Sequence, residues 1–361
     1  MIYKVIGLMS GSSLDGLDIA YVQLEEVRGK WEYTILQAEC IPYDRQWSAA
    51  LKGAAALPVP HMLRLHTAYG RYTGEAVRAF MEKHDLEHKV HFIASHGHTV
   101  FHEPASNTTF QLGDGASIAA ICALPVISDL RAMDVAHGGQ GAPIVPVGDR
   151  LLFGSYDLLL NIGGIANITI RRPDGDLAFD VCPANQVINA LAGRVGKTMD
   201  ENGAIARTGS ILPGILATLE AEEYYSQVPP RSLSNEQAMQ MADALLADDT
   251  SEIKDLLRTT TALIAGRITD AVVRYAPSRE QATMLVTGGG AFNTFLVDEL
   301  QTLLAPYGVT LSVPDAAVVQ YKEALVMALI GVLRWREEAN VFSSVTGSSK
   351  DSVGGALWLP G

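Results

Sequence analysis

Cysteine is scarce in this sequence. Its 361 residues include three cysteines, Cys40, Cys122 and Cys182, and no two of them form a C-x-x-C pair. An odd, widely spaced set of this kind supplies neither a disulfide framework nor a structural zinc site. The sequence therefore indicates a protein of a reducing compartment, and we expect it in the cytoplasm.

Positive charge is also in short supply, and long apolar runs are missing. Lysine and arginine total 27 against 40 aspartates and glutamates, which gives a formal net charge of −13. Nucleic acids and anionic membranes both favour a basic protein surface, so neither is expected as a partner. The longest uncharged stretch, residues 281–297, contains three glycines and is shorter than a membrane span of about 20 apolar residues. The apolar run at residues 5–9 is too short for a secretory signal.

What the chain does contain is the composition of a globular protein, with 48% apolar and 19% charged residues. At about 150 residues per domain, its length suggests two domains. Short β-type runs alternate with segments of helical period, which is typical of an α/β fold. A strand, glycine turn and strand at residues 3–24 recur at residues 158–170. Two such hairpins indicate two domains of like topology, with a break near residue 130.

Helical periodicity is strongest in three segments. Apolar residues recur every three or four positions over residues 61–83 and about 251–275, which predicts amphipathic helices. Residues 323–333 are apolar on nearly all sides, so we expect a helix buried between layers. Residues 224–235 carry Pro229-Pro230 and several serines, and we interpret this segment as a surface loop.

Three glycine-rich turns stand at strand ends: Gly11 to Gly16, Gly163-Gly164 and Thr287 to Asn293. Glycine lets a backbone approach a ligand closely and present its N–H groups to an anion. The third turn also precedes a helix, whose N-terminus favours negative charge. Any one turn is explained without a ligand, but three in one chain favour a nucleotide. In the first turn, Asp15-Gly16 is a dipeptide that favours positive φ in a hairpin.

Two familiar nucleotide motifs are not present. Residues 191–198 end in Gly-Lys-Thr, but a phosphate-binding P-loop requires glycine where Leu191 stands. The segment also ends a predicted helix, whereas a P-loop follows a strand. No G-x-G-x-x-G sequence follows a predicted strand, which argues against a dinucleotide-binding fold.

Asp180 is the most suggestive carboxylate. It ends a β-type run, residues 177–179, and is followed by Cys182-Pro183-Ala184-Asn185 and a predicted helix. At such a place a carboxylate is a helix cap, a general base or a holder of a metal-bound phosphate. Other candidate carboxylates are Asp15, Asp18, Asp114, Asp129 and Asp134.

Histidines gather at residues 96–102. His96, His98 and His102 lie on one side of an extended segment. No cysteine or second carboxylate cluster is nearby, so we expect hydrogen bonds to a substrate here in preference to a metal site. Residues 129–143 form a second polar stretch, which is dense in glycine.

Taken together, these stretches resemble the anhydro-N-acetylmuramic acid kinase family of the sugar kinase, actin and chaperone-ATPase superfold. The resemblance covers nearly the whole chain in the family's order. The matching segments are Gly7 to Asp18, Ser95 to Val100, Gln111 to Gly115, Ser128 to Arg131, Asp134, Gly138 to Pro146, Asn161 to Thr169, Asp180 to Asn185 and Thr287 to Asn293.

The resemblance implies an α/β chain of two RNase-H-like, actin-like ATPase domains that flank a nucleotide cleft. Residues 1–130 with about 340–361 would form the first domain and residues 131–339 the second. It also implies ATP and Mg²⁺, a small anhydrosugar substrate, and a homodimer in bacterial cytoplasm. In the implied reaction, water opens a 1,6-anhydro bridge while ATP phosphorylates O6, and Asp180 deprotonates that water.

The same match assigns the other site residues. No metal ligand is assigned. The implied cofactor contacts are Gly11, Ser12, Ser13, Leu14, Asp15, Gly16, Leu17 and Asp18 in a first phosphate loop, then Gly163 and Gly164, then Gly288, Gly289, Gly290 and Asn293 near the adenosine. The implied sugar contacts are Thr99, His98, Arg131 and Glu323.

The chain departs from the family's pattern at a few positions. Where the family often has Asp-Thr-Gly-Pro-Gly-Asn, Cys182 and Ala184 replace both glycines, so two side chains stand where bare backbone approaches phosphate. Ser12 replaces the usual threonine and keeps its hydroxyl. His98 replaces a common glutamine, a change that bears on sugar contacts or their pH dependence.

Two other functions stay open. A kinase for another 1,6-anhydrosugar, such as levoglucosan, would use the same catalytic mechanism. A catalytically silent, actin-like nucleotide-binding protein would explain the two lost glycines, whereas the retained Asp180 favours an enzyme.

Overall fold

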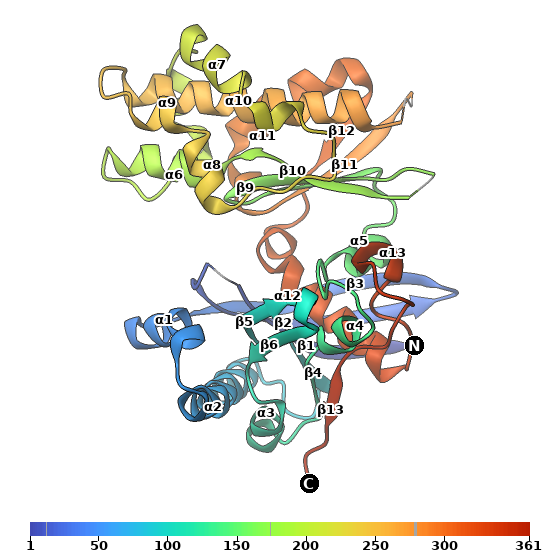
Figure 1. The fold of residues 1–361 in the computed structure, drawn as a ribbon. Coiled ribbons are helices and arrows are strands. Elements are labelled where there is room, and N and C mark those ends of the chain that lie inside the picture. The colour runs from blue at the N-terminus through green and yellow to red at the C-terminus, as the bar shows by residue number, and fades with distance from the viewer. Residues whose placement is uncertain (12, 174, 278–279) are drawn as a thin grey trace. The chain divides into compact units, whose positions relative to one another are not determined.

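The computed structural model describes residues 1–11, 13–173, 175–277 and 280–361 and divides the chain into two compact units (Figure 1). Unit 1 contains residues 1–154 and 321–361, and unit 2 contains residues 155–320. These bounds differ from the expected ones, residues 1–130 with 340–361 and residues 131–339. One reason is that residues 131–154 pack into unit 1, where the Thr346 hydroxyl donates to the fully buried Asp134 at 2.7 Å.

Unit 1 is built on a six-stranded sheet with a separate two-stranded sheet, β5-β6. Its strands are β1 (Ile2–Ser10), β2 (Gly16–Val27), β3 (Lys30–Pro42), β4 (Phe92–Ser95), β5 (His98–Glu103), β6 (Thr108–Leu112), β7 (Val126–Ser128) and β13 (Ala356–Trp358). Its helices are α1 (Arg45–Lys52), α2 (Val59–Lys83), α3 (Gly115–Cys122), α4 (Ala132–Ala136), α5 (Pro146–Leu151), α13 (Ser343–Thr346) and most of α12 (Ala316–Trp335).

Unit 2 is built on one five-stranded sheet. Its strands are β8 (Leu158–Ile162), β9 (Ile165–Ile170), β10 (Leu177–Pro183), β11 (Ala282–Thr287) and β12 (Val309–Ser312). Its helices are α6 (Asn185–Gly193), α7 (Pro213–Glu220), α8 (Asn235–Gln240), α9 (Asp243–Leu246), α10 (Ile253–Tyr275), α11 (Thr294–Leu304) and the start of α12.

The two main sheets share one strand order. Unit 1 has the order β13-β7-β4-β1-β2-β3, and unit 2 has β10-β9-β8-β11-β12. In each, the first three strands form an antiparallel meander, and the next two join parallel to the first. Counted within each unit the order is 3-2-1-4-5, with β13 added antiparallel at the edge of unit 1. This is the RNase-H-like order, so the prediction of two α/β domains of like topology is confirmed.

The first hairpin differs from the prediction in its turn. Positive φ occurs at Leu14 (60°), whereas Gly16 already begins β2 and pairs with Pro42. A Cβ on Gly16 would lie 2.5 Å from the Ile41 carbonyl oxygen and 2.7 Å from the Cys40 sulfur. Glycine is therefore needed here for the close approach of β3, and the expected positive φ at Asp15-Gly16 is wrong.

Helices cover both faces of the unit 1 sheet. On one face, Ile6 and Leu8 of β1 pack against the predicted helix α2, at Val77 and Phe80. Because side chains alternate along a strand, Gly7 points to the other face, and its backbone approaches α12 so closely that a Cβ would collide with the Ala324 carbonyl. α12 therefore forms the second layer, as Figure 1 shows.

The predicted buried helix is the larger part of α12. Residues 324–333 are all buried, which confirms the prediction. Among the described residues, α12 alone is long and apolar enough to cross a membrane by those two criteria, but its burial is that of a core helix. Tyr321 breaks the helical conformation (φ −115°, ψ 20°), and the boundary between the two units falls at this kink.

Candidate active site

The two glycine turns of unit 2 lie together at one edge of its sheet. β8 ends at Ile162 and β11 at Thr287, and because these strands are parallel, the turns that follow them meet. Gly288 has φ +79°, and a Cβ there would lie 2.7 Å from the Ile162 carbonyl oxygen. Glycine is thus required both for the conformation and for the close approach.

Two helices begin at the same edge. The N–H of Asn185, the first residue of α6, donates to the Gly163 carbonyl at 3.1 Å. Asn293 caps α11 by accepting the Leu296 N–H at 3.1 Å. The first N–H groups of α6 are thus paired with the carbonyls of Gly163 and Gly164. What the two helices offer at this edge is their positive dipole ends, which favour phosphate. The structure brings together the predicted nucleotide contacts of unit 2, namely Gly163, Gly164, Gly288, Gly289, Gly290 and Asn293.

Asp180 lies within β10, the edge strand of this sheet, and does not end it. The strand continues to Pro183, and its pairing with β9 shifts register between Asp180 and Cys182. The expected strand end at Asp180 is therefore wrong, and a β-bulge takes its place. A bulge leaves one residue unpaired, bends the strand and changes the direction of neighbouring side chains.

The Asp180 carboxylate is held by one of its two oxygens. The Leu233 N–H donates to Oδ2 at 2.9 Å, and no described residue hydrogen-bonds Oδ1. Burial removes water from the carboxylate and raises its pKa, and the Leu233 hydrogen bond partly offsets that rise. An uncommitted oxygen with a raised pKa suits a general base acting on water.

The predicted surface loop, residues 224–235, packs against Asp180. The Tyr224 hydroxyl donates to the Asp180 carbonyl at 2.7 Å, and the Asp180 N–H donates to the Arg231 carbonyl at 3.0 Å. Arg231 also donates to the Gln227 carbonyl at 2.8 Å, and its guanidinium lies 4.6 Å from the centre of the Tyr224 ring. The segment starts in a 3₁₀ helix, Glu223–Ser226, in which Tyr224 is buried, so it is not the expected surface loop throughout.

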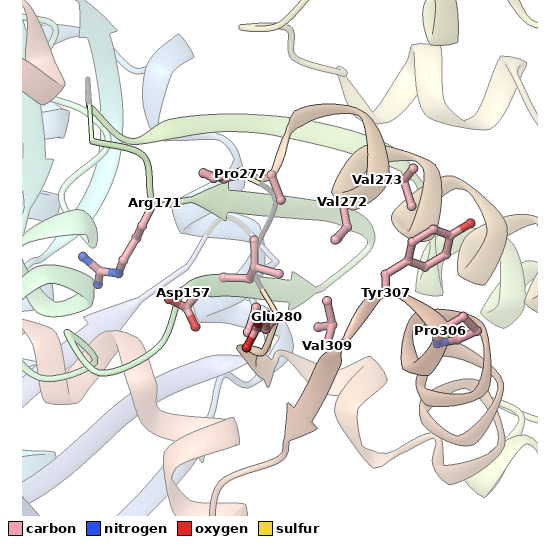
Figure 2. A pocket seen from close by; sticks show the side chains of 13 residues that line it. Asp157, Arg171, Val272, Val273, Pro277, Glu280, Pro306, Tyr307 and Val309 are labelled. Atoms are coloured by element: carbon pink, nitrogen blue, oxygen red, sulfur yellow. The ribbon is translucent and has the colours of Figure 1, made fainter.

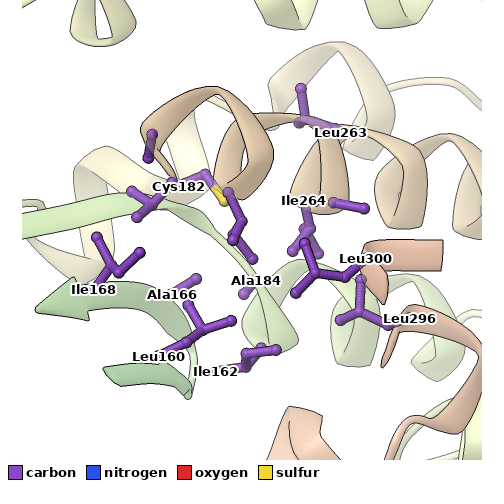
Figure 3. Packing of buried hydrophobic residues seen from close by; sticks show 14 of the residues in the cluster. Leu160, Ile162, Ala166, Ile168, Cys182, Ala184, Leu263, Ile264, Leu296 and Leu300 are labelled. Atoms are coloured by element: carbon purple, nitrogen blue, oxygen red, sulfur yellow. The ribbon is translucent and has the colours of Figure 1, made fainter. Parts of the chain in front are cut away.

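Cys182 and Ala184 place their side chains in the hydrophobic core. Both are fully buried, and Figure 3 shows them among Ala166, Ile264 and Leu300, between the strands and the helices that cover them. Ala184 has φ −137° and ψ −112°, a combination outside the main backbone regions that residues with a Cβ occupy. The two substitutions therefore add core contacts and put no side chain over the phosphate-binding edge.

The residues of the glycine hairpin of unit 1 differ in their exposure to solvent. Ser12 lies outside the described residues. Ser13 and Asp15 are exposed, whereas the Leu17 side chain is buried in the core. Asp18 is half-buried, and burial raises its pKa, an effect to which the Asp15 carboxylate adds. Of these predicted contacts, the exposed groups and the backbone are accessible to a ligand, and the Leu17 side chain is not.

His98 belongs to a buried chain of hydroxyl groups. Its Nδ1 hydrogen-bonds the Ser10 hydroxyl at 3.1 Å, and the Tyr43 hydroxyl donates to Ser10 at 2.7 Å. Tyr43 in turn contacts the Tyr69 hydroxyl. Burial lowers the pKa of His98, which favours its neutral form. The neighbouring Thr99 is exposed on β5. Sequence reasoning gave Ser10, Tyr43 and Tyr69 no role, although Ser10 lies in the matching segment Gly7 to Asp18.

Arg131 and Glu323 carry opposite charges in the same region of unit 1. Arg131 Nε donates to His96 Nε2 at 2.9 Å. Glu323, on α12, raises the pKa of Arg131, although burial lowers it more. Glu323 is exposed as a residue, yet burial of its carboxyl and the Asp18 carboxylate raise the pKa of that group.

Metal-binding side chains are not clustered in the described part of the chain. No group of three or more His, Cys, Asp or Glu residues there is arranged to hold an ion. His96, His98 and His102 hydrogen-bond Gly97, Ser10 and Thr109 respectively.

A cavity of unit 2 lies away from the glycine turns. It has a volume of about 390 Å³ and is lined by residues at the beginnings of β8, β11 and β12, among them Asp157 and Tyr307 (Figure 2). Arg171, which follows β9, and the end of α10 complete the lining. The glycine turns follow the other ends of β8 and β11, roughly 15 Å along the strands. No predicted site residue that the structure describes lines this cavity.

Two RNase-H-like sheets in one chain, each opened by a hairpin with a glycine turn, define the class of the actin-like ATPases and sugar kinases. The family model described as anhydro-N-acetylmuramic acid kinase matches residues 3–360. The chain belongs to the anhydro-N-acetylmuramic acid kinase family.

Curated relatives align with this chain over nearly their whole lengths. An anhydro-N-acetylmuramic acid kinase of Salinibacter ruber is 34% identical, with 99% of this chain and 96% of the relative covered. One of Streptomyces coelicolor is 35% identical, with 98% and 93% covered. One of Paramagnetospirillum magneticum is 31% identical, with 98% and 99% covered.

Proposed function

We propose that this protein is an ATP-dependent kinase that opens 1,6-anhydro-N-acetylmuramic acid with water and phosphorylates its O6. The product is N-acetylmuramic acid 6-phosphate, which places the reaction in the recycling of cell-wall peptidoglycan. Family membership supports the reaction class. The observation that carries the mechanism is the Asp180 carboxylate, with one uncommitted oxygen and a raised pKa.

Asp180 acts as the general base. Its uncommitted oxygen takes a proton from water as the water oxygen forms a bond to C1 of the sugar. The C1–O6 bond breaks, and O6 forms a bond to the γ-phosphorus of ATP while the bond from that phosphorus to ADP breaks. The phosphoryl group thereby replaces the proton that a glycosidase gives to its leaving oxygen. The Leu233 N–H and the residues around Arg231 hold the carboxylate in one orientation.

The glycine turns fit a nucleotide. At Gly288 and Gly290 a Cβ would collide with Ile162, so the backbone is bare where the turns meet. Mg²⁺ retains several waters and needs only one or two protein carboxylates, and Asp15 and Asp18 in the first hairpin are the residues that would hold it. When bound, Mg²⁺ neutralises charge on the transferring phosphoryl group. Thr99 and Glu323 are the proposed sugar contacts.

A direct assay tests this function. Purified protein is incubated with ATP, Mg²⁺ and either 1,6-anhydro-N-acetylmuramic acid or levoglucosan, in water enriched in ¹⁸O. We expect the first sugar to give a 6-phosphate with one ¹⁸O at C1, with no turnover after chelation of Mg²⁺. Turnover of levoglucosan alone would reassign the substrate. ATP binding without turnover of either sugar would favour the silent nucleotide-binding protein.

We also propose a homodimer in the cytoplasm, where ATP is available. Light scattering on the purified chain, with a 38.7 kDa monomer as reference, tests the dimer. Fractionation of the source cells tests the location, and recovery outside the cytoplasmic fraction would contradict it.

A further inference from the structure

Arg131 is held by two neutral acceptors. Its Nε donates to His96 Nε2 at 2.9 Å, and its Nη1 donates to the Gly141 carbonyl. A guanidinium group has five N–H donors in one plane, so these two bonds fix the plane and leave three donors. In the described part of the chain, no carboxylate forms an ion pair with Arg131 within 4.0 Å.

The protonation of His96 follows from its partners. Its Nδ1 lies 2.8 Å from the Gly97 carbonyl, which only accepts hydrogen bonds, so Nδ1 carries the proton. Arg131 Nε only donates, so His96 Nε2 is unprotonated. The imidazole is therefore neutral, in agreement with burial, which together with the Arg131 charge lowers the pKa of His96 to about 3.

The second acceptor is equally well fixed. The Gly141 N–H donates to Asp134 Oδ2 at 2.7 Å. The other oxygen of Asp134 accepts the Thr346 hydroxyl at 2.7 Å, and the residue is fully buried. Gly141 has φ +62°, and a Cβ there would lie 2.6 Å from Val135. The carbonyl that receives Arg131 is thus part of a rigid loop.

This arrangement leaves the charge of Arg131 uncompensated at short range. Arg131 is half-buried, so water solvates it only in part. Glu323 acts on it from beyond ion-pair distance. A planar cation with fixed orientation and free parallel donors binds a carboxylate with two hydrogen bonds.

We propose that His96 is a positioning residue, which holds Arg131 so that its free donors bind a carboxylate on the sugar. The protein thereby selects an anhydrosugar that bears a carboxylate over a neutral one. This role rests on the proposed function and narrows its substrate class.

Two substrates and a few variants test the role. 1,6-anhydro-N-acetylmuramic acid carries a lactyl carboxylate, and 1,6-anhydro-N-acetylglucosamine lacks it. In the wild type we expect kcat/KM to be at least about tenfold higher for the first sugar, the usual effect of a hydrogen-bonded charge. In His96→Leu this ratio falls towards one through a higher KM for the acidic sugar, while kcat/KM for the neutral sugar changes less than about twofold.

Further variants separate positioning from general damage. His96→Gln restores an acceptor near Nε2 and recovers most of the ratio. Arg131→Lys keeps the charge but lacks the planar fork, so the ratio falls as in His96→Leu, and the double variant is no worse than Arg131→Lys. His91→Leu is the control, because His91 is exposed, accepts the Lys4 N–H and makes no hydrogen bond to Arg131.

The outcomes are distinct. If the wild type turns over neither sugar, the proposed function fails. If it turns over both with equal kcat/KM, the function stands and carboxylate selection by Arg131 is overturned. An equal loss for both sugars in folded His96→Leu would make His96 merely structural. If His96→Leu does not fold, a wild-type ratio in Arg131→Lys overturns the proposal, and a ratio near one supports it.

Discussion

Leu233 and Asp180 are 53 positions apart in the chain, yet the Leu233 N–H donates a 2.9 Å hydrogen bond to the Asp180 carboxylate. The donor is a backbone group, so it orients the carboxylate without adding charge. One carboxylate oxygen is thereby fixed and the other is left to act on water.

Asp180→Asn is expected to remove turnover and to keep ATP binding. The amide has no basic oxygen for the water proton, and loss of a general base costs about 10²- to 10⁴-fold in rate. Single-turnover kinetics with 1,6-anhydro-N-acetylmuramic acid and calorimetric titration with ATP give the two values. Asp176→Asn is the matched control, since Asp176 is an exposed carboxylate just before the same strand. Full activity in Asp180→Asn would assign the base to another residue.

Activity should fall in acid at a higher pH than an ordinary aspartate would require. The base works only when deprotonated, and burial raises the pKa of Asp180 above 3.8. As pH decreases, kcat/KM therefore begins to fall above that value. The pH profile of kcat/KM measures this limb, and Glu323→Gln, which removes another carboxyl of raised pKa, should leave its position unchanged. A limb at or below pH 3.8 would mean that the carboxylate is well hydrated.

Arg231→Met should slow turnover with little change in ATP affinity. Arg231 donates to the carbonyls of Tyr224 and Gln227 and so ties together the segment that contacts Asp180. Without these bonds the carboxylate loses its fixed orientation, and we expect kcat to fall about tenfold. Arg274→Met, on the exposed side of α10, provides a control. Equal kcat in Arg231→Met and the wild type would show that the segment does not orient the base.

Gly289→Val should weaken ATP binding without unfolding the protein. A Cβ at Gly289 would meet no protein atom closer than the Asn185 amide nitrogen at 3.5 Å, so the protein can accommodate it. The new side chain would instead collide with a nucleotide bound against the Gly289 backbone. We expect the Kd for ATP to rise at least about tenfold, or roughly 1.4 kcal/mol. Gly290→Val is the contrasting variant, because its side chain would collide with Ile162 and lower Tm. Unchanged ATP affinity in folded Gly289→Val would place the adenosine elsewhere.

Restoring the family's glycine with Cys182→Gly should destabilise the protein and leave ATP affinity unchanged. The change empties a buried position and adds a glycine to a strand, with an expected cost of about 1–3 kcal/mol in the free energy of unfolding. Chemical denaturation measures the cost. Tighter ATP binding in this variant would indicate that Cys182 obstructs the phosphate edge.

The hairpins and long helices were predictable because their signals are local. The period of residues 61–83 and the apolar sides of residues 323–333 follow directly from how α2 and α12 pack. The contacts of Asp180 with Tyr224 and Leu233 were not predictable, because no spacing rule joins residues so far apart. The bulge at Asp180 was also missed, since an extra residue in a strand leaves no compositional trace.

The order of the two units along the chain has a consequence for protein synthesis. Unit 2 is one uninterrupted stretch, residues 155–320, whereas unit 1 needs the last 41 residues, 321–361. Gly7 of β1 packs against the backbone at Ala324, and β7 pairs with β13 at the edge of the sheet. Neither contact can form before residues 321–361 have been synthesised. On the ribosome we therefore expect the middle of the chain to finish folding first, while the amino-terminal strands wait for the carboxyl end to emerge.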